Sequence, residues 1–164
     1  CPDSRRTRPG PEAPAEGPPR PRRPRAYRAA EQNDQNMSKN LEVSWDDGGE
    51  QKAVRGESSS LATDRIGMLD GVARTVVVIE SDGIQVGIGG GNEGRVIAYF
   101  TRDSWNFFNL VGDPRAEGSS ELVAGGQPGD FDRRHIVDAP TAISAVREII
   151  DDGAPTNHLW EAQD

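Results

Sequence analysis

The side chains best suited to chemistry lie together in one short segment of the chain. Asp130, Asp132 and His135 are of the types that bind metal ions or exchange protons with a substrate. On an extended segment, however, Asp132 and His135 would point to opposite faces, because they are three residues apart. Arg133 and Arg134 stand between them, and their positive charges would oppose a bound cation. We therefore predict a structural or partner-contacting role for His135, with a small enzyme built on Asp130, Asp132 and His135 as an alternative.

A glycine-rich stretch offers a second kind of chemistry. Gly89, Gly91 and Gly94 match the G-x-G-x-x-G spacing of dinucleotide-binding loops, in which a helix follows at once and its N-terminus meets the pyrophosphate. Here the chain continues through residues 95–100 with the β-branched and aromatic side chains typical of a strand. The stretch is predicted to be a flexible hairpin loop, and no cofactor is expected. A small ligand-binding or regulatory domain that uses the loop from Gly89 to Gly94 stays open as an alternative.

Nucleophilic catalysis finds little support in the sequence. The chain has no G-x-S-x-G motif, and its single cysteine is Cys1. That lone cysteine also excludes a disulfide framework and a thiolate metal site. His158 has no carboxylate beside it in the sequence and is predicted to lie on the surface. The protein is therefore expected to be non-enzymatic and to need neither cofactor nor metal.

The elements that must position these residues follow from the apolar periodicity. Helices are predicted at 58–73 and 140–152, and strands at 41–45, 74–80, 84–88, 95–100, 121–124, 131–137 and 159–160. A turn at Gly125–Gly129 is expected to aim the strand at 131–137 against the sheet. Successive strands joined by short turns favour antiparallel pairing. The predicted fold class is α+β, a single domain with a mostly antiparallel sheet and two packed helices.

Large aromatic side chains mark the expected core. Trp45 and Trp160 lie near the ends of predicted strands, and Trp105 lies with Phe107 and Phe108 in a predicted loop at residues 103–120. Core packing is the simplest interpretation of all five, because aromatic rings bury large apolar areas. Tryptophan is also the residue most often found at binding hot spots, so a partner contact by Trp105 stays open.

The N-terminal segment differs in composition from the rest. Residues 1–36 hold eight arginines and many prolines but almost no large apolar side chains, so they are expected to form a disordered Arg/Pro-rich tail. The first methionine is Met37, which suggests that the natural start is there, that residues 1–36 are translated upstream sequence, and that the domain spans 37–164. A genuine basic tail that binds nucleic acid or a membrane is the alternative.

The charge of the expected domain limits its partners. Residues 37–164 contain 22 acidic and 11 basic residues, a net charge of −11, whereas the whole chain carries −8. Such an acidic domain is not expected to bind nucleic acid or an anionic membrane, but it suits a basic protein partner. Solubility alone is the alternative explanation. The longest apolar run, Val76–Ile79, is too short to cross a bilayer. The absence of a bilayer-spanning run and the presence of only one cysteine together favour a cytoplasmic protein.

The order of these motifs resembles a known family. The pattern runs from Ile88–Gly91 and the strand to Tyr99, through Trp105, Asn106, Asn109 and Leu110, to Gly125–Gly129, Arg133–His135, the helix at 140–152 and Leu159–Glu161. Over roughly residues 38–162 it is similar to the immunity protein family numbered one of bacterial polymorphic toxin systems. The resemblance implies a cytosolic antitoxin without catalytic residues, encoded beside a secreted toxin that damages nucleic acid, often a deaminase. Residues 1–36 have no counterpart in that family.

An antitoxin of this kind would bind its toxin through exposed acids. A toxin that attacks nucleic acid presents a basic groove, which an acidic domain can occupy and close to substrate. Loops carry binding residues more often than strands do. The candidates for toxin contact are the residues in or beside predicted turns and loops: Asp46, Asp47, Glu93, Asp103, Trp105, Asp130 and Asp132.

Overall fold

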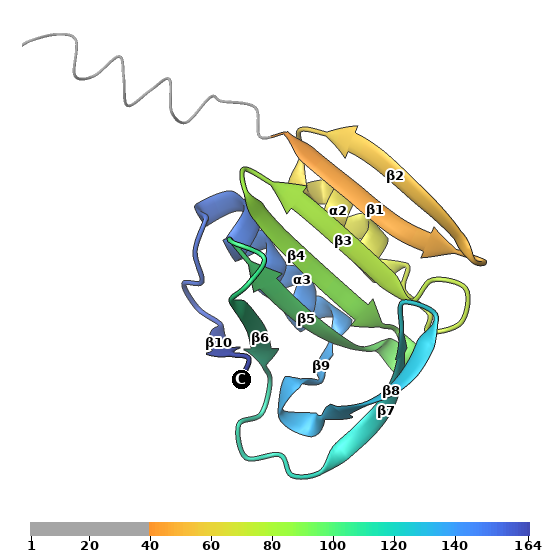
Figure 1. Cartoon of the computed structure of the whole chain (residues 1–164), viewed down its shortest axis with the longest axis vertical. Coiled ribbons are helices and arrows are strands. Elements are labelled where there is room, and N and C mark those ends of the chain that lie inside the picture. The colour runs from red at the N-terminus through yellow and green to blue at the C-terminus, as the bar shows by residue number, and fades with distance from the viewer. Residues whose placement is uncertain (1–39) are drawn as a thin grey trace, which may run out of the picture. The chain divides into compact units, whose positions relative to one another are not determined.

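The structure of the protein is a computed structural model that describes residues 40–164. Within them the chain forms a large antiparallel sheet with two helices on one face (Figure 1). The predictions for residues 1–36 and for Met37 lie outside the described residues. For the part described, the predicted fold class is confirmed: α+β, with a mostly antiparallel sheet and two packed helices.

The main sheet has the strand order β10-β6-β5-β4-β3-β1-β2, and a short β9 also pairs with β5. Its strands are β1 (Leu41–Asp47), β2 (Glu50–Gly56), β3 (Val76–Ser81), β4 (Ile84–Gly90), β5 (Arg95–Thr101), β6 (Phe107–Val111), β9 (Val137–Asp138) and β10 (Leu159–Ala162). A separate hairpin consists of β7 (Ser119–Ala124) and β8 (Gln127–Asp132). The helices are α2 (Ser59–Gly67) and α3 (Ala139–Arg147), and α3 continues into a π-helical turn, Glu148–Asp152.

The hydrophobic core lies between the sheet and the two helices. Alternate residues of the strands point toward α2 and α3, and on this face Val43, Val77, Ile79 and Ile88 are fully buried. At the β10 side of the core, Phe100 stacks on Phe108 with ring centroids 5.0 Å apart and meets Trp160 edge-on at 4.9 Å. Trp45 is also buried, as predicted, and the Arg65 guanidinium lies 3.9 Å from its ring centroid.

The two helices begin and end at specific capping residues. The Ser58 side chain accepts the Ser60 N–H at the start of α2, and Asp138 accepts the Thr141 N–H at the start of α3. The predicted helix at 58–73 is too long, since α2 ends at Gly67. The next residues form a loop in which one Asp70 carboxylate oxygen accepts the N–H groups of Val72, Ala73 and Arg74. The predicted end of the second helix is confirmed, because Gly153 closes it with a φ of 74°.

The glycine-rich stretch is packed rather than flexible. Gly89 and Gly90 belong to β4, and Gly91 has a φ of 117°. A Cβ on Gly91 would lie 2.5 Å from the Asp70 nitrogen, so only glycine fits against this loop. The predicted hairpin loop is confirmed for residues 91–94, which join β4 to its antiparallel neighbour β5, whereas Gly89 and Gly90 already belong to β4. A strand follows the loop, as expected, and not a dinucleotide-binding helix.

Four further segments differ from the sequence-based expectation. The turn predicted over Gly125–Gly129 is confined to Gly125 and Gly126, because Gln127 already belongs to β8. The strand predicted at 131–137 is divided by a 3₁₀ turn at Arg133–His135. Strands β2 and β6 were not predicted; β6 lies inside the expected loop at 103–120, and β2 lacks apolar alternation because almost all of it is exposed.

Candidate functional site

The predicted toxin-contact residues lie in three separate places. Asp46, Asp47 and Glu93 are at the end of the sheet where β1 finishes and β5 begins. Asp103 and Trp105 occupy the β5–β6 loop at the opposite end of the strands, because β5 runs the length of the sheet between the two sites. Asp130 and Asp132 are on β8 of the separate hairpin. These seven residues therefore do not form a single surface.

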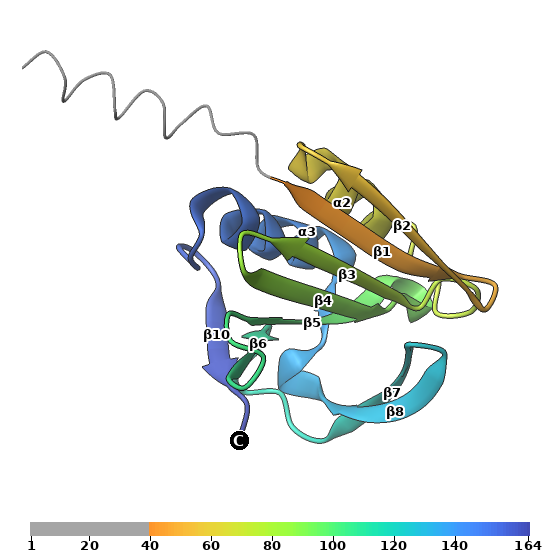
Figure 2. The ribbon, with the colours of Figure 1, turned by 45° about the horizontal axis from the view of Figure 1, so that its top comes forward.

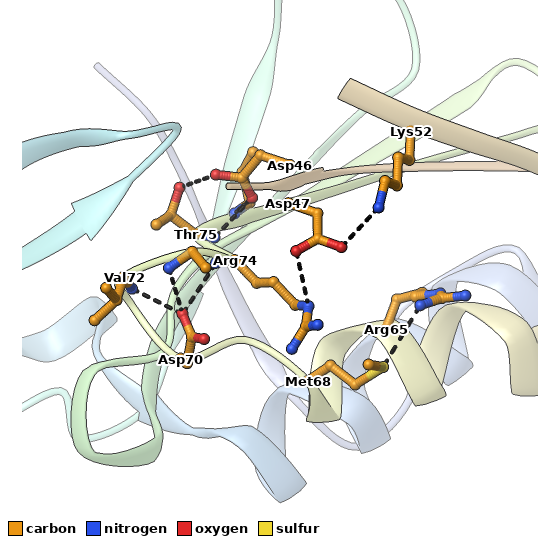
Figure 3. A network of polar contacts seen from close by, with 11 residues as sticks. Asp46, Asp47, Lys52, Arg65, Met68, Asp70, Val72, Arg74 and Thr75 are labelled. Carbon is orange, nitrogen blue, oxygen red and sulfur yellow. Dashed lines mark hydrogen bonds and ion pairs between the residues drawn. The ribbon is translucent and has the colours of Figure 1, made fainter. Parts of the chain in front are cut away.

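The Asp46 side chain is buried and stabilises the fold through hydrogen bonds. Asp46 is the penultimate residue of β1 and only 8% exposed, while the turn itself consists of Gly48 and Gly49. Figure 3 shows its carboxylate accepting hydrogen bonds from Thr75, whose hydroxyl donates to Oδ2. The backbone nitrogens of Thr75 and Val76 donate to Oδ1 at 2.7 and 2.9 Å. The expectation of an exposed turn residue does not hold for Asp46.

Asp47 is more accessible and takes part in two ion pairs. Its carboxylate lies 2.8 Å from Lys52 Nζ and 3.5 Å from Arg74 Nε (Figure 3). The hydrogen bond from Lys52 holds the pKa of Asp47 below its usual value, with Arg74 adding to the effect. Glu93 is more exposed still, 3.6 Å from Arg95 Nη2.

The tip of the β7–β8 hairpin is fastened to the sheet by polar contacts. The Thr75 hydroxyl, which donates to Asp46, accepts the Gly126 N–H at 2.8 Å. Farther along the hairpin, Arg95 Nη1 donates to the Ser120 hydroxyl at 3.1 Å. Leu122 is fully buried beneath the hairpin. Figure 2 shows the hairpin on the side of the sheet away from α2 and α3, so it stands over the otherwise open face.

A groove of about 590 Å³ lies between this hairpin and the open face of the sheet. Tyr99 and Phe107 meet edge-on in its lining, with ring centroids 5.7 Å apart. Tyr99 also covers Gly87, where a Cβ would lie 2.3 Å from the ring, and burial raises the pKa of Tyr99. Phe131 of β8 adds a third ring to the lining. The groove therefore has aromatic walls that can contact an apolar or cationic side chain.

Four charged or titratable side chains, connected by hydrogen bonds and ion pairs, lie along one side of the groove. Arg134 donates to Asp132 Oδ2 at 2.9 and 3.0 Å and lies 3.4 Å from Glu161 Oε2. His135 Nε2 lies 3.2 Å from the same Glu161 oxygen. The hydrogen bonds of Arg134 lower the pKa of Asp132, and Asp132 raises that of Arg134. Asp132 is thus occupied by an ion pair.

The prediction that Asp132 and His135 point to opposite faces is wrong. It assumed an extended chain, whereas residues 133–135 make a 3₁₀ turn that Asp132 caps by accepting the Arg134 N–H at 2.9 Å. Both side chains therefore line the same groove. Asp130 lines it as well and, within residues 40–164, has neither a hydrogen bond nor an ion pair. Its exposed carboxylate is therefore available to a partner.

Trp105 is the most exposed tryptophan, contrary to the prediction of core packing. Its side chain is 86% exposed in a turn that Asp103 organises. One Asp103 oxygen accepts the N–H groups of Trp105 and Asn106 at 2.9 and 2.8 Å, and the other accepts the Asn106 side-chain amide at 2.6 Å. These hydrogen bonds lower the pKa of Asp103 to about 2. The indole is consequently presented to solvent from an ordered turn, two residues before Phe107 of the groove.

His158 contacts a second buried acid, Glu148, and is not simply a surface residue as predicted. Glu148, 9% exposed, accepts hydrogen bonds from His158 Nδ1 at 2.9 Å and from the N–H groups of Asn157 and Thr156 at 3.1 and 3.2 Å. Burial opposes ionisation of Glu148, but these donors outweigh it and lower its pKa to about 2. His158 is thus part of a contact that fastens the segment before β10 to the end of α3.

A larger hollow of about 730 Å³ lies at the start of β1. Glu42, Glu57, Glu80 and Asp82 are among its lining residues, together with Arg55, which donates to Glu42 at 2.7 Å. Its lining includes the apolar Leu41 and Ile84 but no aromatic side chain. The groove between the hairpin and the sheet combines acids with aromatic rings, so we take it as the candidate site.

Residues 40–164 contain neither a candidate metal site nor a helix that could span a membrane. No group of three or more His, Cys, Asp or Glu side chains there is placed to hold a metal ion. None of the helices in the same range is long and apolar enough to cross a bilayer. Comparison with known proteins finds no matching family model and no matching curated protein.

Proposed function

We propose that the protein is an immunity protein, an antitoxin that binds a basic toxin domain and thereby keeps it from its nucleic-acid substrate. The observation that carries this proposal is the groove, where the unpaired Asp130 carboxylate lines the same cavity as the rings of Tyr99, Phe107 and Phe131. A carboxylate beside aromatic faces suits an arginine or lysine side chain, which such a toxin carries in abundance. The resemblance of the sequence to the immunity family numbered one supports the same function.

Charge and shape act together in this proposal. The net charge of −11 over residues 37–164 attracts a basic partner and raises its association rate. Trp105, exposed in the β5–β6 loop two residues before Phe107, supplies a separate aromatic anchor. A toxin held there would have its own basic cleft covered, so no catalytic group of the immunity protein is required.

The test uses the toxin domain that the proposal expects to be encoded beside this gene. Co-expression of the full chain should rescue cells from that toxin, and titration calorimetry should give stoichiometric binding. Asp130→Asn should weaken binding at least tenfold, on the order of 1.4 kcal/mol. Asp64→Asn removes the same charge from the exposed side of α2 and serves as the matched control. If the toxin is neither bound nor neutralised, the proposed function fails.

A small-ligand domain is the second candidate, because a cavity of about 590 Å³ is large enough for a drug-sized molecule. The rescue assay separates the two functions. A domain that binds only a small cationic ligand would lose it on Asp130→Asn but would not rescue cells from any neighbouring toxin.

A further inference from the structure

Strand β2 forms an open edge of the main sheet. It is the last strand in the sheet order, and within residues 40–164 no element pairs with its outer side (Figure 1). Its seven residues pair with β1 in an unbroken register, without proline or bulge. Open edges of this length are normally shortened, bent or covered, because their unpaired backbone groups bind other strands.

The β1–β2 turn determines which backbone groups face outward. Gly48 and Gly49 have φ values of 63° and 88°, as in the two-residue turn of type I′. In such a hairpin the closing pair, Asp47 and Glu50, exchanges both backbone hydrogen bonds, and bonded and non-bonded pairs then alternate. Gln51, Ala53 and Arg55 therefore direct their N–H and C=O groups away from β1, toward the open side.

The side chains of β2 leave this edge accessible. Lys52 Nζ is held 2.8 Å from Asp47, and Arg55 Nε is held 2.7 Å from Glu42. Both cations are thus drawn back toward β1, where their charges are compensated. Ala53 is small, and Val54 is 42% exposed. The edge is locally close to neutral, although residues 37–164 are strongly acidic.

We infer that β2 pairs antiparallel with β2 of a second copy of this chain, with the two-fold axis at Ala53. Gln51 then faces Arg55 of the partner subunit, and Ala53 faces Ala53 of the partner subunit. All three outward-facing residues pair with outward-facing residues, and each pair exchanges two hydrogen bonds. Val54 lies opposite Lys52 of the partner subunit and packs on its aliphatic stem.

Neighbouring registers are less favourable. A two-fold axis at Lys52 would place two lysines directly opposite each other, and one at Val54 would leave Gln51 unpaired. In the favoured register no like charges face each other. The groove lies among β5, β6 and β10, toward the other edge of the sheet, so both grooves of the dimer stay open. Dimerisation is therefore independent of the proposed toxin binding and would make the protein bivalent.

Sedimentation equilibrium of the full chain over a wide concentration range tests the pairing. The wild type should reach twice its monomer mass of 17.7 kDa. Ala53→Pro should weaken dimerisation at least tenfold, because it removes an outward N–H from each copy and leaves the ladder to β1 intact. Ala53→Thr keeps that N–H and is the matched control, expected to dimerise like the wild type. Circular dichroism checks the fold, and if Ala53→Pro fails to fold, Val54→Lys replaces it, since it brings two lysines together across the interface.

Hydrogen exchange identifies the edge that is used. The amides of Gln51, Ala53 and Arg55 should become protected as the concentration rises, whereas those of Lys52 and Val54, already bonded to β1, should change little. A protein that stays monomeric at every concentration would overturn the inference. So would equal dimerisation of Ala53→Pro and Ala53→Thr. Protection of the three amides in a species of monomer mass would assign the edge to a strand other than a second copy.

Discussion

The buried carboxylate of Asp46 and the hydroxyl of Thr75 form a hydrogen-bonded pair that links the sheet to the β7–β8 hairpin. Thr75 donates to Asp46 (Figure 3) and accepts the Gly126 N–H at 2.8 Å, so a single hydroxyl connects β1, the start of β3 and the tip of the hairpin. The hairpin in turn forms one wall of the groove. These hydrogen bonds at the end of the sheet thus hold one wall of the groove in place. Asp46, Thr75 and Gly126 do not themselves line the groove.

Thr75→Val should destabilise the protein and loosen the hairpin. Valine has the shape of threonine but cannot bond to Asp46 or Gly126, so the loss should be about 2 kcal/mol in the free energy of unfolding, measured by urea denaturation. Ser44→Ala is the control, because the Ser44 hydroxyl makes only a long 3.5 Å contact with the Val78 carbonyl. Equal losses of unfolding free energy in the two variants would show that the hydrogen bonds linking Asp46, Thr75 and Gly126 add no particular stability.

Glu148 should make stability depend on pH in the acidic range. Its pKa is about 2 in the folded protein, below the value of 4.5 for an unperturbed glutamate. Its contribution is therefore present above pH 4.5 and is lost as the pH falls toward 2. Glu148→Gln should flatten the stability curve in this window and cost on the order of 2 kcal/mol at neutral pH. Thermal melts between pH 2 and pH 7 measure both effects, and an unchanged pH profile would contradict the assignment. Asp103, whose pKa is also about 2, keeps part of the dependence in the variant.

Trp105→Ala should separate binding from stability. The side chain is 86% exposed, so its removal should change the free energy of unfolding by less than about 0.5 kcal/mol. If Trp105 anchors the toxin, the variant should lose about 2 kcal/mol or more of binding free energy in a titration. Val72→Ala, at an 84% exposed position in another loop, is the control and should bind normally. Normal toxin affinity of Trp105→Ala would remove this residue from the interface.

His135→Gln should leave the protein folded and neutralising. Glutamine can still reach Glu161 with a hydrogen-bond donor, and the proposed function assigns no proton transfer to His135. The enzyme alternative expects the reverse, a folded protein without activity. A toxin-rescue assay combined with a thermal melt decides between them. A folded but non-protective variant would place His135 at a catalytic centre or in the interface.

Gly126→Val should cost more stability than Gly129→Val. Gly126 has a φ of 77°, which a β-branched residue adopts only with strain, so a loss of about 2 kcal/mol is expected. Gly129 lies in β8 without such a φ, and a Cβ there would only approach the Phe131 ring at 3.3 Å. Toxin affinity per folded molecule should change less than stability in both variants. Similar unfolding free energies for the two would contradict the assigned turn.

Local patterns in the sequence predicted much of the fold. The alternation around Val77 and Ile79, the Asp82–Gly83 turn and the caps of α3 depend on neighbouring residues, so the strands and the second helix could be located directly. Strand β2 could not, because its exposed residues show no alternation and the strand exists through its backbone pairing with β1. The 3₁₀ turn before His135 was missed for a similar reason, since its cap, Asp132, had been interpreted as part of a strand.

The sequence by itself determined the acidity of the chain, the α+β order of elements and the presence of carboxylates beside turns. Only the tertiary structure decided which of those carboxylates face solvent. Asp46 and Asp130 look alike in the sequence, yet one is enclosed by Thr75 and the other lies unpaired in the groove. Likewise Trp45 is buried and Trp105 is exposed. The physical reason is that periodicity reports which side chains an element can turn inward, whereas burial depends on which distant segment packs against it.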